Sequence, residues 1–288
     1  MLKSGFYSGV NMQEYHHGIG AFAESKSSLA NILDSPRKFK FEKDNPEQLD
    51  VFDLKAVKFN EGEAFHTYFL EPDKFKSQIS IIPIYKGTGS QSARNLYQQG
   101  VKDRGLVPIA KATEEMLQDF NDLLHSGEHE TVRKVLEHPD RFVEYSGFWQ
   151  DPDTGIWLKT KPDLIASNVV IWDIKKHTSI KSFRSQAMDL DHDLQAYMAL
   201  IGCSILTGIK HTDFGFIVFH AKEKPYDIEI VMADSDFIKS GRDKFLTATL
   251  TLQACLESDK WPGKYEDKIG RLSPTDWRLR QLEMKREY

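Results

Sequence analysis

The spacing of apolar residues changes along the chain, and this change predicts an α/β fold. In several segments up to residue 136, apolar positions recur at the three- and four-residue spacing of amphipathic helices. We therefore predict helices over residues 25–39, 59–70, 111–124 and 128–136. From residue 142 onward, apolar and polar positions alternate, and this shorter period predicts strands over residues 142–150, 156–166 and 169–176.

The second half of the chain contains both patterns. Residues 185–206 and 235–256 predict two long helices, whereas residues 214–219 and 227–231 predict two further strands. Such a mixture is typical of an α/β protein with a central mixed β-sheet flanked by helices. The sequence has no evident internal repeat or linker. We therefore expect one domain over residues 1–288, with its core at about 20–265.

Two of the predicted strands carry acidic and basic residues at close spacing. Asp163 follows a proline at the start of an apolar run, and Asp173 and Lys175 are separated only by Ile174. Because alternate side chains of a strand share a face, Asp173 and Lys175 should point the same way, with Ile174 in the opposite layer. Turn-forming residues at 151–155 and 167–168 predict two adjacent hairpins, which would build an antiparallel sheet around both aspartates.

This arrangement predicts a metal site. Mg²⁺ prefers carboxylate and carbonyl oxygens, which Asp163, Asp173 and the backbone of Ile174 would supply. Lys175 would steer or deprotonate a water molecule and stabilise the charge that develops on a phosphate. The residues are therefore suited to hydrolysis of a phosphodiester bond with Mg²⁺, or with Mn²⁺ as a substitute.

Three residues outside this motif are further candidates. His66 lies on the predicted helix 59–70 and could be a metal ligand, since imidazole is a common partner of carboxylates. Glu144, on the first predicted strand, could bind a metal directly or through water. Gln195, on the helix that follows the sheet, could orient Lys175 or contact a phosphate.

Basic residues flank the acids. Lys161 and Lys176 lie beside Asp163 and Lys175 in the sequence, and Tyr197 could stack on a substrate or hydrogen-bond to it. Scattered lysines usually form a solvated face. Their position next to the acids instead favours a groove that follows a phosphate backbone.

Composition limits the classes of function. The chain has 288 residues and a net charge of −5, which excludes a uniformly basic nucleic-acid coat but allows a local basic groove. Cys203 and Cys255 lie in apolar surroundings and fit buried thiols in a reducing compartment. The first residues lack the apolar stretch of a signal peptide, and no run reaches membrane-spanning length. We therefore expect a cytoplasmic protein that has no membrane partner.

The order of these residues resembles the PD-(D/E)xK nuclease superfamily, whose core is restriction-endonuclease-like. The matching series is His66, Glu144, Lys161-Pro162-Asp163, Asp173-Ile174-Lys175 and Gln195. More closely, residues 143–165, 169–176 and 192–198 resemble the exodeoxyribonuclease VIII (RecE-type) nuclease domain of phages and prophages. Residues 62–72 resemble the early histidine helix of that family, and the resemblance extends over roughly residues 20–265.

The resemblance implies roles for individual residues. Asp163, Asp173 and His66 match the metal ligands, and Lys175 matches the catalytic lysine. Glu144 and Gln195 match an acidic position before the core motif and the glutamine of its trailing helix. Two departures concern residues outside this set. Ala199 stands where the family usually has a tyrosine, which leaves the role of Tyr197 open, and Lys176 stands where threonine is frequent.

The resemblance also implies an activity and partners. Members of this group digest linear double-stranded DNA processively from 5′ ends, form rings of identical subunits, and feed a single-strand annealing protein during recombination. Two other functions remain open from the residues themselves. One is a structure- or site-specific endonuclease on the same scaffold, and the other is a non-catalytic DNA-binding recombination scaffold.

Overall fold

A five-stranded mixed sheet forms the centre of the protein. The computed structural model describes residues 3–45, 53–166, 170–179 and 181–266, together with residues 269, 273, 274, 277 and 280. The strand order is β10 (Asp227–Met232), β9 (Asp213–His220), β8 (Val170–His177), β7 (Leu164–Ala166) and β4 (Arg141–Val143). Neighbouring strands are antiparallel except β8 and β9, which are parallel. The predicted central mixed sheet is therefore confirmed.

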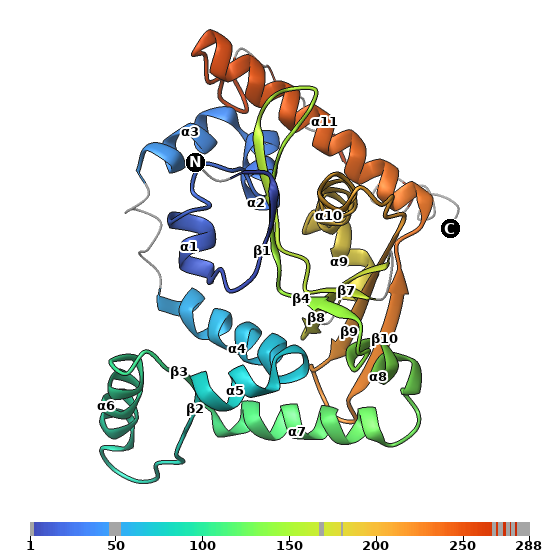
Figure 1. The fold of residues 1–288 in the computed structure, drawn as a ribbon. Helices are drawn as coiled ribbons and strands as arrows, with labels where there is room; N and C mark the ends of the chain where they lie inside the picture. Colours follow the sequence, from blue (N-terminus) through green and yellow to red (C-terminus); the bar gives the residue numbers. More distant parts are fainter. Residues whose placement is uncertain are drawn as a thin grey trace, which may run out of the picture.

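Helices cover both faces of this sheet (Figure 1). On one face the apolar core joins the strands to α4 (Asp53–Leu70), α7 (Lys111–His125) and α8 (Glu130–Leu136). On the other face it joins them to α9 (Phe183–Asp189) and α10 (His192–Thr207). The predicted α/β fold class is therefore confirmed. None of the helices in the described part of the chain combines the length and apolar character needed to cross a bilayer.

A second, smaller sheet lies above the first in Figure 1. It joins β1 (Gly5–Tyr7), β5 (Ser146–Gln150) and β6 (Trp157–Thr160). Trp149 and Leu158 bring these strands into one core with α2 (Lys26–Asp34), α3 (Pro36–Asp44), α10 and α11 (Ser235–Ser258). The short helix α1 (Met12–His17) packs through Tyr15 onto Phe148 of β5.

The prediction of one antiparallel sheet built from two adjacent hairpins was therefore partly wrong. The first hairpin, β5 and β6, belongs to the smaller sheet, where β5 also pairs with β1. Only the second hairpin, β7 and β8, lies in the main sheet. A hairpin is fixed by its local turn, whereas its place in a sheet depends on distant strands such as β1.

A further unit of the chain consists of α5 (Pro72–Gln78), β2 (Ile79–Ile82), α6 (Ser90–Lys102) and β3 (Val107–Ala110). β2 and β3 form a two-stranded parallel pair, and α6 connects them. Figure 1 shows α6 at the outer edge of the molecule, beyond α4 and α7.

Two predicted helices are each divided in two. The segment 25–39 breaks at Ser35, whose hydroxyl accepts a hydrogen bond from the amide of Lys38 and caps α3 ahead of Pro36. The segment 185–206 breaks at Leu190 and Asp191, because Asp191 adopts a left-handed conformation with φ 53°. The apolar spacing continues through both breaks and therefore did not reveal them.

Two predicted strands are also interrupted. The segment 142–150 ends β4 at Val143 and resumes as β5 at Ser146, because Glu144 has a φ of 57°. Glu144 thus lies in the sharp connection between β4 and β5. The prediction that it lies on a strand was wrong. The segment 156–166 breaks at Lys161, Pro162 and Asp163, where proline has no amide to donate to a ladder.

The close packing of α10 against α11 yields a testable prediction. In Gly241→Ala, the new Cβ atom would lie 2.0 Å from the backbone oxygen of Asp193, so the two helices would have to separate. Overpacking of this kind costs about 1–3 kcal/mol of the free energy of unfolding, and thermal denaturation should show a lower Tm.

Gly100→Ala in α6 is the matched control. A Cβ atom there meets nothing within 4 Å, and alanine is the better helix former. If Gly241→Ala kept the Tm of the wild type, the close approach of α10 and α11 would be contradicted.

Candidate active site

The pairing of β7 with β8 brings the two aspartates of the sequence motif together. Leu164 pairs with Trp172, so Asp163 enters β7 opposite Asp173. One oxygen of Asp163, Oδ2, accepts a hydrogen bond of 2.6 Å from the amide of Ile174. This bond fixes the Asp163 carboxylate against β8 and leaves its other oxygen free to face a different group.

Asp173 and Lys175 lie on one face of β8, as their spacing predicts. The ammonium of Lys175 is 2.7 Å from Asp173 Oδ2, and the side-chain amide of Gln195 on α10 donates to Asp173 Oδ1 at 2.5 Å. Ile174 between them is buried in the core of the opposite face. The sequence suggested that Gln195 orients Lys175. In the structure its side-chain amide instead contacts Asp173.

His66 of α4 reaches the same end of β7 and β8. Its Nδ1 lies 3.4 Å from both Glu144 Oε1 and Asp163 Oδ1, and its Nε2 lies 3.2 Å from the carbonyl oxygen of Ile174. One possible ligand atom from each of His66, Glu144 and Asp163 lies within 4.8 Å of the others. These three residues could therefore share one metal ion.

The unusual backbone of Glu144 directs its side chain into this group. A left-handed conformation is rare for glutamate, and here the amide of Glu144 donates to the carbonyl oxygen of Asp163 at 3.2 Å. The second oxygen of the Glu144 carboxylate forms an ion pair with Lys161. The connection between β4 and β5 thus supplies an acid that the predicted strand would have placed differently.

Electrostatic coupling shifts the pKa values of His66 and Glu144 in opposite directions. Burial by itself lowers the pKa of His66, but the carboxylates of Asp163 and Glu144 outweigh it and hold this pKa well above 6.5. Burial by itself raises the pKa of Glu144, but His66 and Lys161 outweigh it and lower this pKa to about 2. At neutral pH the two residues therefore form an imidazolium–carboxylate pair.

Asp173 and Lys175 form the second charged pair. Burial, together with nearby Asp163, raises the pKa of Asp173, although Lys175 opposes that shift. Burial by itself lowers the pKa of Lys175, but Asp173 and Asp163 outweigh it and raise this pKa. Lys175 is consequently held as an ammonium ion beside the two acids.

The donor atoms of the site suit a hard divalent cation. Carboxylate oxygens of Glu144 and Asp163 lie at Nδ1 of the His66 imidazole and the carbonyl oxygen of Ile174 lies at its Nε2, and Mg²⁺ and Mn²⁺ accept ligands of these kinds. Of the four metal ligands predicted, the structure groups His66 and Asp163 with Glu144. Asp173 lies on the adjacent strand, where both of its oxygens face Lys175 or Gln195.

Two predicted substrate-binding residues are engaged elsewhere. The ammonium of Lys176 lies 2.6 Å from Glu61 of α4. The ring of Tyr197 packs against Phe245 of α11, with ring centroids 5.3 Å apart. The roles of these two residues toward a substrate, like those of the other site residues, stay predictions.

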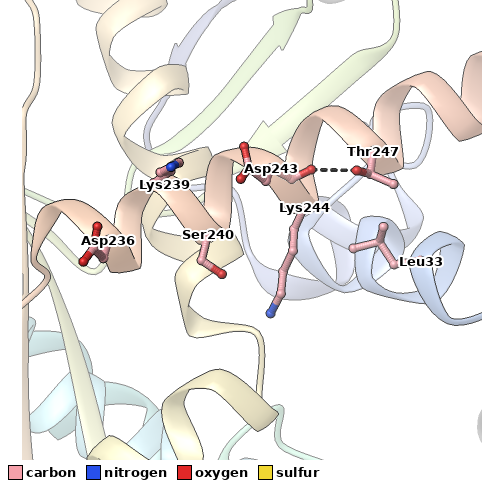
Figure 2. Close-up of a pocket in the computed structure, with 7 residues that line it drawn as sticks. All are labelled: Leu33, Asp236, Lys239, Ser240, Asp243, Lys244 and Thr247. Carbon is pink, nitrogen blue, oxygen red and sulfur yellow. Dashed lines mark hydrogen bonds between the residues drawn. The ribbon is translucent and has the colours of Figure 1, made fainter.

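The sequence did not reveal how α10 is held so that Gln195 reaches Asp173. Asp193, which has no exposed surface, accepts hydrogen bonds from Ser240 at 2.6 Å and from Lys244 at 2.9 Å. Lys244 also contacts Asp191, at 2.7 Å. Figure 2 shows Ser240 and Lys244 projecting from the same side of α11, next to a shallow pocket. In the sequence, this contact between α10 and α11 is marked only by Asp191 and Asp193, which lie close to Gln195.

A buried histidine also lies near the site. His192, at the start of α10, stacks on Phe183 with ring centroids 5.8 Å apart. Burial, helped by the charge of Lys175, lowers its pKa to about 4. This residue is therefore neutral at physiological pH, and no pattern in the sequence singles it out.

Comparison with known proteins identifies the fold family. The model of a PDDEXK-like domain of unknown function (DUF3799) matches residues 25–268. A crystal structure described as that of a "Putative exonuclease" from Eubacterium rectale superposes with a TM-score of 0.59 at 12% sequence identity, over 95% of this chain and 98% of that one.

A second structure, that of SSO0001, has 13% identity and a TM-score of 0.27 over 66% of this chain and 85% of that one, too low to carry an argument. A search of curated proteins finds no match. Because the family model spans most of the sequence, including every predicted site residue, the chain belongs to the family of PDDEXK-like domains of unknown function, DUF3799.

Proposed function

We propose that the protein is a Mg²⁺-dependent exonuclease that degrades linear double-stranded DNA, from 5′ to 3′, in phage-type recombination. The observation that carries this proposal is the convergence of His66, Glu144 and Asp163 beside the Asp173–Lys175 pair. Membership of a PDDEXK-like family supports a nuclease, and the resemblance of the motifs to RecE-type domains supports the exonuclease. The similar fold of a chain described as an exonuclease agrees with it.

The chain's own residues account for metal binding and substrate charge. His66, Glu144 and Asp163 would hold the cation, with Asp173 and the carbonyl of Ile174 as adjacent oxygen donors. When bound, a divalent cation lowers the pKa of a coordinated water and offsets negative charge on the scissile phosphate. Lys161 is held at the edge of this group by its ion pair with Glu144, where it can contact the substrate backbone.

Lys175 is assigned the role of a cation at the scissile phosphate. Its raised pKa makes it a poor proton acceptor at neutral pH, which favours stabilisation of developing charge over deprotonation of water. Gln195 acts through Asp173, since its amide holds one oxygen of that carboxylate and leaves the other beside Lys175.

The partners in this proposal follow from the same resemblance. A ring of identical subunits would enclose the DNA and allow processive digestion. A single-strand annealing protein would take up the strand that remains. The alternatives are an endonuclease on the same scaffold and a non-catalytic DNA-binding scaffold. A comparison of linear with circular DNA distinguishes these alternatives from the exonuclease.

The first test compares an end-labelled linear duplex with a covalently closed circle. With Mg²⁺, the protein should degrade the linear duplex and leave the circle intact, because an exonuclease needs an end. Release of the label from each 5′ or 3′ end gives the polarity. Cleavage of the circle would favour the endonuclease, and no cleavage of either would favour the scaffold.

Asp173→Asn is the control for this assay. It should remove cleavage while duplex binding survives, because the change removes one charge from the site without changing side-chain size. Asp213→Asn, at the exposed start of β9, is the matched substitution away from the site. Full activity of Asp173→Asn would mean that another site performs the cleavage.

The pKa of His66 predicts how metal binding depends on pH. A metal ligand must be neutral imidazole, so the cation has to displace the proton that Asp163 and Glu144 hold on His66. Below the raised pKa, the affinity for Mn²⁺ should fall by about tenfold per pH unit. Titration calorimetry with Mn²⁺ alone measures this, and His66→Gln should flatten the dependence.

The metal-free protein should show the opposite trend in stability. Because the pKa of His66 is raised on folding, its stabilising contribution is complete below pH 6.5 and is lost as the pH rises through the folded value. His125→Gln, which replaces an exposed histidine of α7, is the control for the stability measurement.

For the metal-binding measurement, an unchanged pH dependence of Mn²⁺ affinity in His66→Gln would exclude His66 as the titrating ligand.

The anchor of α10 predicts a coupling between Lys244 and Gln195. Lys244→Met leaves the buried Asp193 carboxylate with the Ser240 hydroxyl and the Leu194 amide as its donors within the described residues, and should lower kcat by shifting Gln195, with little change in KM. In a Gln195→Ala background the same change should cause no further loss of kcat, since coupled residues are not additive. Single-turnover rates of the four proteins measure this cycle.

Lys239→Met is the matched control on the same helix, because Lys239 has no ion pair within the described ranges. Lys244→Arg should restore part of kcat. Additive losses in the double variant would show that Lys244 supports the fold without acting through Gln195.

A further inference from the structure

One stretch of the chain is positively charged and contains no acid. Residues 74–102 include no Asp or Glu, although the chain has 43 acidic residues and a net charge of −5. The stretch carries five basic residues, namely Lys74, Lys76, Lys86, Arg94 and Lys102. Lys74 and Lys76 lie 3.0 and 4.0 Å from Glu71 and Asp73, respectively. The basic residues of this stretch that lack an acidic partner within the described residues therefore come after α5.

The remaining cations lie on a unit that we call the arm, residues 79–110, formed by β2, α6 and β3. Helix α6 packs on its own two strands through buried Val101 and through Tyr97, whose hydroxyl lies 3.3 Å from that of Ser80. The loop of residues 83–89 is exposed throughout. Figure 1 shows α6 at the margin of the molecule, so its outer side is open to a partner.

One flank of α6 is suited to contacts with phosphate. At 100° per residue, Gln91, Arg94, Asn95, Gln98 and Lys102 fall on the same side of the helix, next to the face that packs on the strands. This flank contains cations and amides but no acid. Among the residues that the structure describes, Lys86, Arg94 and Lys102 form no ion pair, unlike Lys74 and Lys76.

The arm is attached to the helix that carries part of the candidate site. Ile109 of β3 and Phe65 of α4 belong to one apolar core, and Phe65 directly precedes His66. In the site itself, the carboxylates of Glu144, Asp163 and Asp173 are matched by His66, Lys161 and Lys175, which leaves no excess of positive charge there for a polyanion. A DNA substrate therefore needs cations elsewhere on the protein to hold it.

We propose that the arm binds the phosphate backbone of double-stranded DNA, with Lys86, Arg94 and Lys102 as the contacting cations. This inference rests on the proposed nuclease function and names a substrate contact outside its catalytic centre. Cations and amides contact phosphates without reading bases, so the grip is independent of sequence. The exposed side chains of Ile84 and Leu96 make a second copy of the chain the other conceivable occupant.

The salt dependence of binding tests this proposal. Each phosphate contact contributes about 0.9 to the slope of log affinity against log salt concentration. The triple variant Lys86→Gln, Arg94→Gln, Lys102→Gln should therefore bind a blunt DNA duplex with a slope that is flatter by about 2.7. Arg94→Gln alone should flatten it by about 0.9. Fluorescence anisotropy from 50 to 200 mM salt, in the Asp173→Asn background without divalent metal, measures the slope.

A second triple variant controls for net charge. Lys38→Gln, Lys134→Gln and Lys224→Gln remove the same charge from lysines that are already paired with acids, and should leave the slope nearly unchanged. Equal slopes for the two triple variants would overturn the proposal. The proposal would also be overturned if the arm triple variant kept the salt slope of the wild type but had a smaller mass in light scattering. The arm would then be a contact between subunits.

The outcome also separates this inference from the proposed function. If the wild type digests linear duplex while the arm variant keeps the slope, only the arm assignment fails. If the wild type neither digests nor binds duplex, the nuclease function fails and the arm assignment with it.

Discussion

The candidate site depends on the hydrogen bond between the Asp163 carboxylate and the amide of Ile174. The bond is 2.6 Å long and buried, and a hydrogen bond to a charged group contributes about 1.5–3 kcal/mol. It forms where Pro162 interrupts the chain before β7, so a side chain takes the place of a ladder bond. As a result, one oxygen of Asp163 is fixed against β8 while the other faces His66. Asp163 is thereby held beside His66, which also lies beside Glu144.

Charge balance is the second constraint. Glu144, Asp163 and Asp173 converge in a poorly solvated place, and buried charges are tolerated only when they are paired. The cations that pair with them are His66, Lys161 and Lys175. This balance explains why the pKa of His66 rises while that of Glu144 falls. It also means that a divalent cation entering the group competes with a proton and an ammonium ion, which makes occupancy sensitive to pH.

The sequence predicted those parts of the site that depend on local periodicity. Asp173 and Lys175 share a face, with Ile174 in the opposite core, because the period of a strand is fixed by its own backbone. The same alternation predicted the strands from β4 to β8, but not which of them pair with one another. Glu144 was placed on a strand because a residue with positive φ leaves no mark on an alternating pattern. Likewise, the breaks at Ser35 and Asp191 interrupt segments whose apolar spacing continues without change.

The contacts that hold these local features in place could not be predicted, since they join distant parts of the sequence. Lys244 reaches Asp193 from 51 positions away, and no pattern on either helix indicates the pair. The same holds for Lys176, which was predicted to contact the substrate. In the structure it forms an ion pair with Glu61 of α4. The motif therefore locates the acids, but packing decides which of their oxygens stay available. Both oxygens of Asp173 lie against Lys175 or Gln195, and the oxygens of Glu144 and Asp163 are likewise engaged, by His66, Lys161 and the amide of Ile174. His66, Glu144 and Asp163 differ from Asp173 in that one possible ligand atom of each lies within 4.8 Å of the others, so one divalent cation could bind all three.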